Sequence, residues 1–460
     1  MKKILFCLLL LAVFSGVYAQ DLKFDGYLNS GAGLVFTDRQ ISDPYSTTPG
    51  ARKARPYFTA FGVDSEQWGY RFRLNGSYTN KDANAGVKFR LQAQSQNGAT
   101  AVNRAITFPT AQGWVSFLDS VITVNGGIIN DGTWETGDVY LNDDMGEGLG
   151  LLTKITPIKG LDFGLGAYAI SSLGGGDNNA LARSIVSNFA EFDDVKYTVN
   201  LAYTMPDVFR AKISWRNKNR AGTDGSGNTT RTAPGRDESS RLFLSAGVLA
   251  VKGLTAVVAA DFDNIQSFST VKTGDVNAWG GTVAAGGRIN NSGKLNFHEA
   301  LGYKVSDLSV GFNASQFISF AERDVTNNIT GITTQEKVDA SLFFNPWVSY
   351  SLGNLVPRLD LVYMVGGQIN GSSATAEGKY YRRGYDPNYT RETWVLGIRP
   401  SVKFNLGSCF LELGDLVSVE KQENKFYGVN VVSPFSLPNS DTRKDSRVTN
   451  TLYADLKWSF

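Results

Sequence analysis

The sequence predicts an all-β protein, a transmembrane antiparallel β-barrel of eighteen strands. Many segments of the 460-residue chain alternate apolar with polar residues, which is the period of a strand with two different faces. Short turns and long polar connections follow one another along the chain, as they do in membrane barrels. After residue 19 no run of about 18 apolar residues could form a spanning helix. A sheet in lipid must then close on itself, because an open edge would leave backbone groups unpaired.

Residues 1–19 have the pattern of a secretory signal peptide. Lys2 and Lys3 form a positive start, residues 4–13 are apolar, and Val17-Tyr18-Ala19 provides a site for signal peptidase. The apolar stretch is too short to cross a bilayer as a helix. We therefore expect residues 1–19 to be removed and residues 20–460 to form a single transmembrane β-barrel domain.

The charge and cysteine content narrow the class further. Lys and Arg number 45 against 43 Asp and Glu, and two of the basic residues lie in the predicted signal peptide. This balance argues against nucleic acid as a partner and against a polybasic membrane-surface role. Without the signal peptide, Cys409 is the one remaining cysteine, so no intramolecular disulfide is expected. We interpret Cys409, beside a predicted turn, as a packing residue.

The alternating segments, taken in order, predict the eighteen strands. Their borders are rich in Gly, Asn, Asp, Pro and Ser, the residues that turns require. The expected strands are 22–36, 67–79, 85–96, 110–118, 121–130, 147–157, 160–171, 190–204, 207–219, 238–251, 253–268, 292–304, 307–321, 335–351, 355–370, 391–406, 408–423 and 446–460.

Eight connections are short enough to be tight turns. They are 80–84, 119–120, 159–160, 206–207, 252–253, 306–307, 353–354 and 407–408. Together they join sixteen strands, and one further strand at each end gives an even total. Both termini of the barrel domain then lie on the same side as the short turns, which is the expected periplasmic side, opposite the long external loops. Sixteen strands is the main alternative, and the strand-like segments 54–64 and 276–289 are assigned to external loops or strand extensions.

The segment 450–460 predicts the strand that closes the barrel. Its polar positions include Tyr453, Asp455 and Lys457, which we expect on the inner face. An amphipathic strand that finishes on Phe resembles the assembly signal of bacterial outer-membrane β-barrels. That resemblance implies a place in the outer membrane and recognition by the barrel assembly machinery. An ordinary half-buried terminal strand is the alternative. The residues expected to form the signal, on the outer face, are Leu452, Ala454, Leu456, Trp458 and Phe460.

Two strands joined by one short turn carry a basic patch. Phe72 and Leu74 alternate with basic residues on the first strand, and the second alternates in the same way. Charges face lipid only at a high cost, so the basic set should face the interior. A solvated inner face without a tuning role is the alternative to a constriction. The basic patch consists of Arg71, Arg73, Lys88 and Arg90.

The same alternation sorts the charges of later strands. Ile213, Trp215 and Leu361 are expected to face outward. The charged residues that alternate with the outward residues of each strand are expected to face inward. The predicted inner charge is mostly positive. The inward basic residues are Lys212, Arg216, Arg358, Arg399 and Lys403.

One connection, at 131–147, is unusually acidic, and it is the third long loop. The whole pattern resembles bacterial outer-membrane porins of 16–18 strands, whose third long loop folds into the barrel with its acids facing a basic ladder. The resemblance implies a constriction between this loop and the basic patch, since charged rings set pore selectivity. A solvated surface loop is the alternative. The acidic residues concerned are Asp131, Glu135, Asp138, Asp143, Asp144 and Glu147.

We expect no cofactor, no metal site and no enzymatic activity. A calcium site from Asp138, Asp143 and Asp144 would lack the spacing of a ligand loop. His298 is the only histidine, and no nucleophile elbow surrounds Ser292 near it.

These features favour an outer-membrane channel for passive diffusion of small hydrophilic solutes, with a mild anion bias. Outer-membrane lipid is the expected surrounding, and either a monomer or a homotrimer fits the outward aromatic residues. Two alternatives stay open. One is a surface-exposed barrel whose long loops act as an adhesin, and the other is a channel selective for one class of solute.

Overall fold

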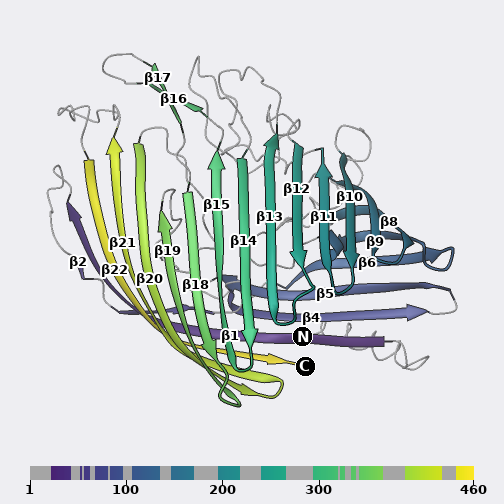
Figure 1. The fold of residues 1–460 in the computed structure, drawn as a ribbon, viewed down its shortest axis with the longest axis horizontal. Helices are drawn as coiled ribbons and strands as arrows, with labels where there is room; N and C mark the ends of the chain where they lie inside the picture. The colour runs from purple at the N-terminus through teal and green to yellow at the C-terminus, as the bar shows by residue number, and fades with distance from the viewer. Residues whose placement is uncertain are drawn as a thin grey trace.

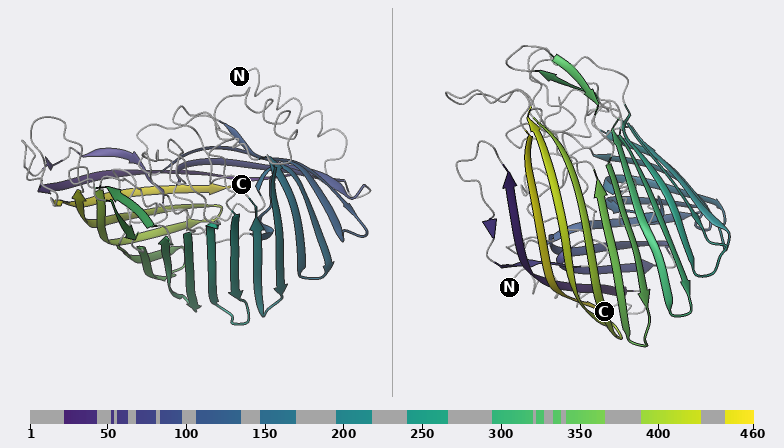
Figure 2. Two further views of the ribbon diagram at one scale, coloured as in Figure 1. Left: turned by 90° about the horizontal axis from the view of Figure 1, so that it is seen from above. Right: turned by 60° about the vertical axis from the view of Figure 1, so that its left-hand side comes forward.

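The protein forms one antiparallel sheet that closes into a barrel, as the computed structural model shows (Figures 1 and 2). The structure describes residues 22–42, 52–53, 56–62, 68–80, 83–96, 106–134, 147–169, 195–217, 240–265, 294–319, 322–326, 333–337, 341–365, 389–426 and 442–460. Within these residues the wall has eighteen strands, so the predicted strand number is confirmed and the sixteen-stranded alternative is wrong.

The wall strands follow the chain from one side of the barrel seam to the other, each paired with the next. In order they are β1 (Leu22–Ser42), β4 (Trp68–Asn80), β5 (Ala85–Gln96), β6 (Thr107–Phe117), β7 (Ile122–Asn130), β8 (Glu147–Ile158), β9 (Leu161–Ala169), β10 (Val195–Met205), β11 (Phe209–Arg216), β12 (Ser240–Val248), β13 (Leu254–Ile265), β14 (Lys294–Val305), β15 (Leu308–Ser319), β18 (Ser341–Tyr350), β19 (Leu355–Val365), β20 (Tyr389–Leu406), β21 (Cys409–Phe426) and β22 (Thr442–Ser459).

Four short strands and one 3-10 turn complete the description. β2 (Arg52–Lys53) and β3 (Tyr57–Ala60) pair with β1 within its residues 32–39, whereas β4 pairs with residues 22–30 of β1. They therefore continue the place beside β1 that β4 occupies, and they add no wall strand of their own. β16 (Glu322–Thr326) and β17 (Thr333–Lys337) form a separate two-stranded hairpin, and η1 spans Gly132–Trp134.

The seam between β1 and β22 closes the barrel. The two strands pair from Tyr27 opposite Ser459 to Ser42 opposite Lys444, and they run together in Figure 1 as the purple and yellow ribbons. Gly26 and Phe460 extend this ladder by exchanging both backbone hydrogen bonds, at 2.9 and 3.0 Å. The seam thus leaves neither strand as an open edge along this length.

The eight short turns all lie where the sequence placed them, and each contains a residue with a positive φ angle. Gly160 and Gly407 supply that conformation in two turns, and Asn84 and Asp207 supply it in two others. These residue types reach the left-handed region at the least steric cost. The turn chemistry therefore sets where each hairpin reverses, which in turn sets the register of the wall.

The outer face of the wall is an apolar belt, as a barrel surrounded by lipid requires. Its side chains are exposed, and they alternate along each strand with inward side chains that are half-buried or buried. Members of the belt around the wall include Phe24, Val87, Leu151, Leu165, Ile213, Trp215, Val258, Leu301, Phe344, Leu361, Leu396 and Leu452.

Two carboxylates interrupt this belt. Glu299 pairs with Val258 on one side and Ala314 on the other, and Val258 is exposed on the outer face. Asp415 pairs with outward Leu452, and its Oδ2 accepts a hydrogen bond from Asn450 Nδ2 at 3.4 Å. The sequence-based rule that charges face inward therefore fails at these two positions of the belt.

One strand assignment is wrong, and one is narrowed to a single alternative. Residues 57–60 of the segment 54–64, which was assigned to an external loop or a strand extension, form β3 and are a strand extension. Residues 335–337, predicted to begin a wall strand, instead belong to the β16–β17 hairpin, and the wall strand begins at Ser341. Residues 276–289 lie outside the described residues.

In the part of the chain that the structure describes, no helix is long and apolar enough to cross a membrane.

The variant Glu299→Leu tests the outward position of Glu299. A carboxylate in the apolar belt opposes insertion into lipid, so its replacement should raise the free energy of unfolding in phospholipid vesicles by about 1–2 kcal/mol. Equilibrium urea unfolding measures this change. Ala300→Leu, on the inner face one residue along β14, is the control and should not stabilise the protein. A loss of stability in Glu299→Leu would contradict the assignment.

Candidate functional site: the inner wall of the barrel

The predicted basic patch lies together on the inner face of β4 and β5. Register places Arg71 opposite Gln94 and Arg73 opposite Gln92. Gln92 Oε1 accepts hydrogen bonds from Arg71 Nη2 at 2.8 Å and from Arg73 Nε at 3.1 Å. One neutral amide therefore holds two guanidinium groups side by side.

The other two members of the patch lie one step nearer the short turn. Arg90 Nε donates to Asn75 Oδ1 at 3.0 Å, and Asn75 Nδ2 donates to Asp25 Oδ1 at 2.6 Å. Lys88 Nζ donates to the backbone oxygen of Asn130 at 3.0 Å. Lys88 thus connects the patch to the residue directly before the acidic connection.

The start of the acidic connection packs on the inner wall. Trp134 in η1 is fully buried, and a Cβ at Gly164 on β9 would overlap its ring. Asp131 Oδ1 accepts a hydrogen bond from the Thr133 backbone amide at 2.8 Å, and Lys154 Nζ donates to Thr133 Oγ1 at 3.0 Å. Residues 131–134 therefore turn inward. Glu135, Asp138, Asp143 and Asp144 lie outside the described residues, as does the side chain of Glu147.

Lys212 and Arg216 also lie on the inner face, where Arg216 pairs with Arg241 across β11 and β12. Arg241 donates twice to Asp261, through Nε at 2.6 Å and Nη2 at 2.7 Å. Both of these partners are buried. Neither residue of this ion pair was predicted as a site residue, although Arg241 alternates with the outward residues of its strand.

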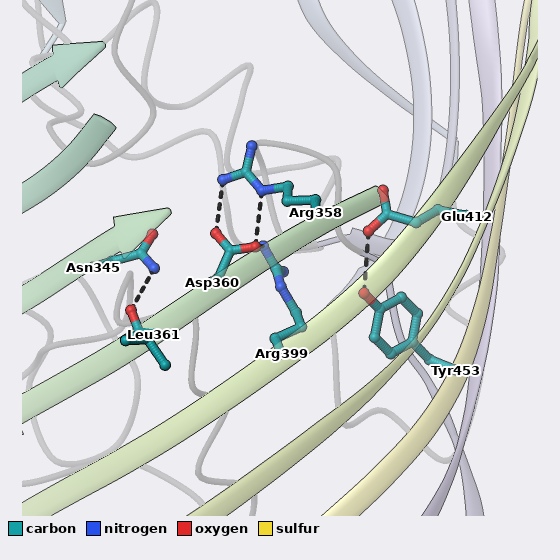
Figure 3. Close-up of polar contacts among 7 residues, drawn as sticks. All are labelled: Asn345, Arg358, Asp360, Leu361, Arg399, Glu412 and Tyr453. Atoms are coloured by element: carbon teal, nitrogen blue, oxygen red, sulfur yellow. Dashed lines mark hydrogen bonds and ion pairs between the residues drawn. The ribbon is translucent and has the colours of Figure 1, made fainter. Parts of the chain in front are cut away.

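A third charged group joins β19 and β20 (Figure 3). Asp360 is fully buried, and its carboxylate receives hydrogen bonds from Arg358 at 2.7 and 2.8 Å. Arg399 Nη2 lies 3.1 Å from the same carboxylate. Two guanidinium groups therefore share one carboxylate. Lys403 follows Arg399 along the same inner face, with its Nζ 3.8 Å from the centre of the Phe410 ring.

Barrel closure brings the basic patch toward the strands that carry Arg358, Asp360 and Arg399. On β1, Asn29 lies opposite Arg71 on one side and opposite Lys457 on the other. The neighbouring Tyr27 ring receives the Arg73 guanidinium at 5.5 Å and the Lys457 amine at 4.5 Å. We call the resulting band the basic arc. Its members, from β5 through the seam to β19, are Arg90, Arg73, Arg71, Lys457, Lys403, Arg399 and Arg358.

The predicted assembly signal lies on the outer face. Leu452, Ala454, Leu456, Trp458 and Phe460 are exposed, whereas Tyr453 and Asp455 between them are buried on the inner face. The Trp458 and Phe460 rings meet edge to face, with centroids 6.3 Å apart. The geometry fits the assignment of the faces, and the role in assembly stays a prediction.

Apolar residues on the inner face are the feature that the sequence analysis missed. One cluster contains Ile129, Trp134, Leu152, Tyr168 and Ala202, and a second contains Phe61, Phe343, Val362, Met364, Val395, Leu416 and Tyr453. Phe243 and Ala259 form a third. Alternation alone sorted residues by polarity and so could not identify apolar residues that point inward. His298 also points inward, and its Nδ1 lies 2.8 Å from Ser315 Oγ.

Comparisons with known proteins were made on both sequence and structure. No protein-family model and no curated protein matches the sequence. Among solved structures, OccAB1 of Acinetobacter baumannii is similar at 11% identity and a TM-score of 0.44, covering 94% of this chain and 96% of its own. The outer membrane channel DcaP of the same organism has 12% identity, a TM-score of 0.42, and coverage of 96% and 97%. OmpF of Salmonella typhi, in complex with daunomycin, has 12% identity, a TM-score of 0.34, and coverage of 96% and 99%.

The variant Asp360→Asn tests the shared anion on the inner wall. It keeps the shape of the side chain but leaves Arg358 and Arg399 without their counter-charge. We expect the free energy of unfolding to fall by about 3 kcal/mol, because breaking a buried ion pair leaves uncompensated charge. Urea titration in vesicles measures the loss. Asp415→Asn, on the outer face of the adjoining strand pair, is the matched control. Equal effects of the two variants would show that Asp360 has no special structural role.

Proposed function

We propose that this protein is an outer-membrane channel through which small hydrophilic solutes diffuse passively, with a mild preference for anions. The observation that carries the proposal is the basic arc inside a closed barrel with an apolar outer belt. Charged rings on a pore wall act on passing ions through their field, and no covalent chemistry is involved. The outer membrane follows from the barrel itself, since closed barrels with short turns at one end are built for that membrane.

The charges on the wall explain why the preference is for anions. Gln92 and Asn75 position Arg71, Arg73 and Arg90 through neutral amides. The seven cations of the basic arc outnumber the described inward carboxylates of the same strands, which are Asp25, Asp360, Glu412, Glu420 and Asp455. We expect this excess to give the band a positive field, which is stronger within a protein wall than in bulk water.

The remaining parts of the proposal concern export and surroundings. Residues 1–19 act as a cleaved signal peptide, and the barrel assembly machinery recognises the strand that contains Leu452 to Phe460. Outer-membrane lipid surrounds the belt, and the working assembly is a monomer or a homotrimer. The acidic residues of 131–147 contribute to a constriction together with the basic patch. Lys88 of the patch contacts Asn130, the residue directly before this connection.

Single-channel recording in planar bilayers tests the proposal. Wild-type protein should show conductance steps, and its reversal potential in a KCl gradient should indicate a preference for chloride. A variant with Arg71, Arg73, Lys88 and Arg90 all changed to Gln should still conduct, but its chloride preference should fall toward that of free solution, since the wall field is weakened.

The control variant changes Lys23 and Lys159, which lie at the short-turn end of the wall, to Gln. It should keep the wild-type selectivity. Folded wild-type protein without conductance steps would overturn the channel proposal. Unchanged selectivity in the fourfold variant would overturn the role of the basic patch.

A further inference from the structure

An aromatic ring on β1 lies against two cations of the basic arc. Tyr27 pairs directly with Arg73 of β4, so the two side chains share the inner face. The centre of the Tyr27 ring lies 5.5 Å from the Arg73 guanidinium carbon and 4.5 Å from Lys457 Nζ of β22. A cation within about 6 Å of a ring centre is attracted by the electrons of the ring face. One ring at the seam therefore adjoins positive charges from the strands on both sides of β1.

A second ring continues this pattern on β21. Phe410 pairs with Lys457 on one side and with Asn405 of β20 on the other. Lys403, two residues from Asn405 and on the same face, has its Nζ 3.8 Å from the centre of the Phe410 ring. Rings and cations thus alternate across neighbouring strands. We call these residues the aromatic–basic strip, which consists, from β4 to β20, of Arg73, Tyr27, Lys457, Phe410 and Lys403.

The strip is accessible from the interior of the barrel. All five side chains are half-buried, and their exposed parts face inward because register places them opposite the apolar belt. A barrel of eighteen strands is wide enough to hold water along such a wall. Phe410 is the second residue of β21, which begins directly after the short turn at 407–408. The strip therefore reaches the end of the interior where the short turns lie.

The carboxylates next to the strip are less accessible than its cations. Glu412, which pairs with Lys403, is 8% exposed, and Asp455 of β22 is 0% exposed. Asp25 is the exposed carboxylate among the described residues at the edge of the strip, and its Oδ1 accepts a hydrogen bond from Asn75 Nδ2 at 2.6 Å. The surface that a solute meets is therefore mainly positive and aromatic.

This combination of side chains suits one chemical class of solute. Lysine and arginine attract an anionic group, and arginine also stacks on planar rings. Aromatic side chains pack against a second aromatic ring with a preference beyond the area that is buried. A small inorganic anion would use only the cations of the strip, and a neutral aromatic solute would use only its rings.

We propose that the aromatic–basic strip is a binding site for small aromatic anions, in which a carboxylate, sulfonate or phosphate group is attached to a planar ring. This inference rests on the proposed channel function and names the solute class that the wall favours. The anionic group lies among the cations, and the planar ring packs against Tyr27 and Phe410.

Binding of two sulfonates to the folded protein in detergent tests the site by isothermal titration calorimetry. Benzenesulfonate and cyclohexanesulfonate carry the same charged group and have similar sizes, but only the first is aromatic. Benzenesulfonate should bind about fivefold or more tightly, because its ring can pack against the two aromatic side chains. This comparison uses the wild type, so it does not depend on how well a variant folds. Equal affinities would overturn the site.

The double variant Tyr27→Leu with Phe410→Leu locates the binding. It keeps all cations of the strip, so cyclohexanesulfonate should bind about as it does to the wild type, whereas the advantage of benzenesulfonate should be lost. Phe24→Leu with Phe404→Leu, on the outer face of β1 and β20, is the matched control and should keep that advantage. A folded Tyr27→Leu, Phe410→Leu variant that still prefers benzenesulfonate would overturn the assignment to the strip.

The same two sulfonates, one on each side of a planar bilayer, test whether the strip acts on permeation. The reversal potential of wild-type channels should favour benzenesulfonate, and a reversal potential of zero would overturn the assignment of the solute class. Absence of conductance steps would instead overturn the channel function and leave a measured difference in binding intact, so the two failures are distinguishable.

Discussion

The pairing of β1 with β22 is the interaction on which the rest of the structure depends. A sheet in hydrocarbon has no water to satisfy its edge groups, so both edges must meet. The ladder from Tyr27–Ser459 to Ser42–Lys444, with the double hydrogen bond between Gly26 and Phe460, meets that requirement. It also joins residues that are far apart in sequence. Arg71 and Lys457 flank Asn29 only because the barrel closes there.

The inner wall combines positive charge with local neutral support. Amide side chains hold the arginines of β4 and β5, whereas Asp360 and Asp261 each hold arginines elsewhere on the wall. Buried ion pairs of this kind add little net stability but fix geometry, because losing one partner is costly. The same wall carries apolar clusters, and Phe61, the residue directly after β3, belongs to one of them. A charged field and an apolar surface thus occupy one interior.

Much of this fold could be predicted from sequence, for a physical reason. Alternation has a period of two and turns need particular residues, so both strand position and facing are encoded locally. Arg71 and Phe72, for example, face as alternation requires. The division of the neighbour of β1 into β3 and β4 was not predictable in this way, because it depends on which residues of β1 each segment meets. The Arg241–Asp261 pair is likewise a relation between two strands. Glu299 and Asp415 depart from the polarity rule, and no local pattern announces such exceptions.

A disulfide across the seam tests the central claim most directly. Gly26 and Phe460 form a hydrogen-bonded pair, so Thr37 and Thr449, an odd number of residues along the ladder, occupy a non-hydrogen-bonded pair whose Cα atoms should be about 4.5 Å apart. That spacing permits a disulfide. In a Cys409→Ser background, Thr37→Cys with Thr449→Cys should form an intrachain disulfide nearly completely in folded protein. Free thiols, or only interchain products, would contradict closure of the barrel in this register.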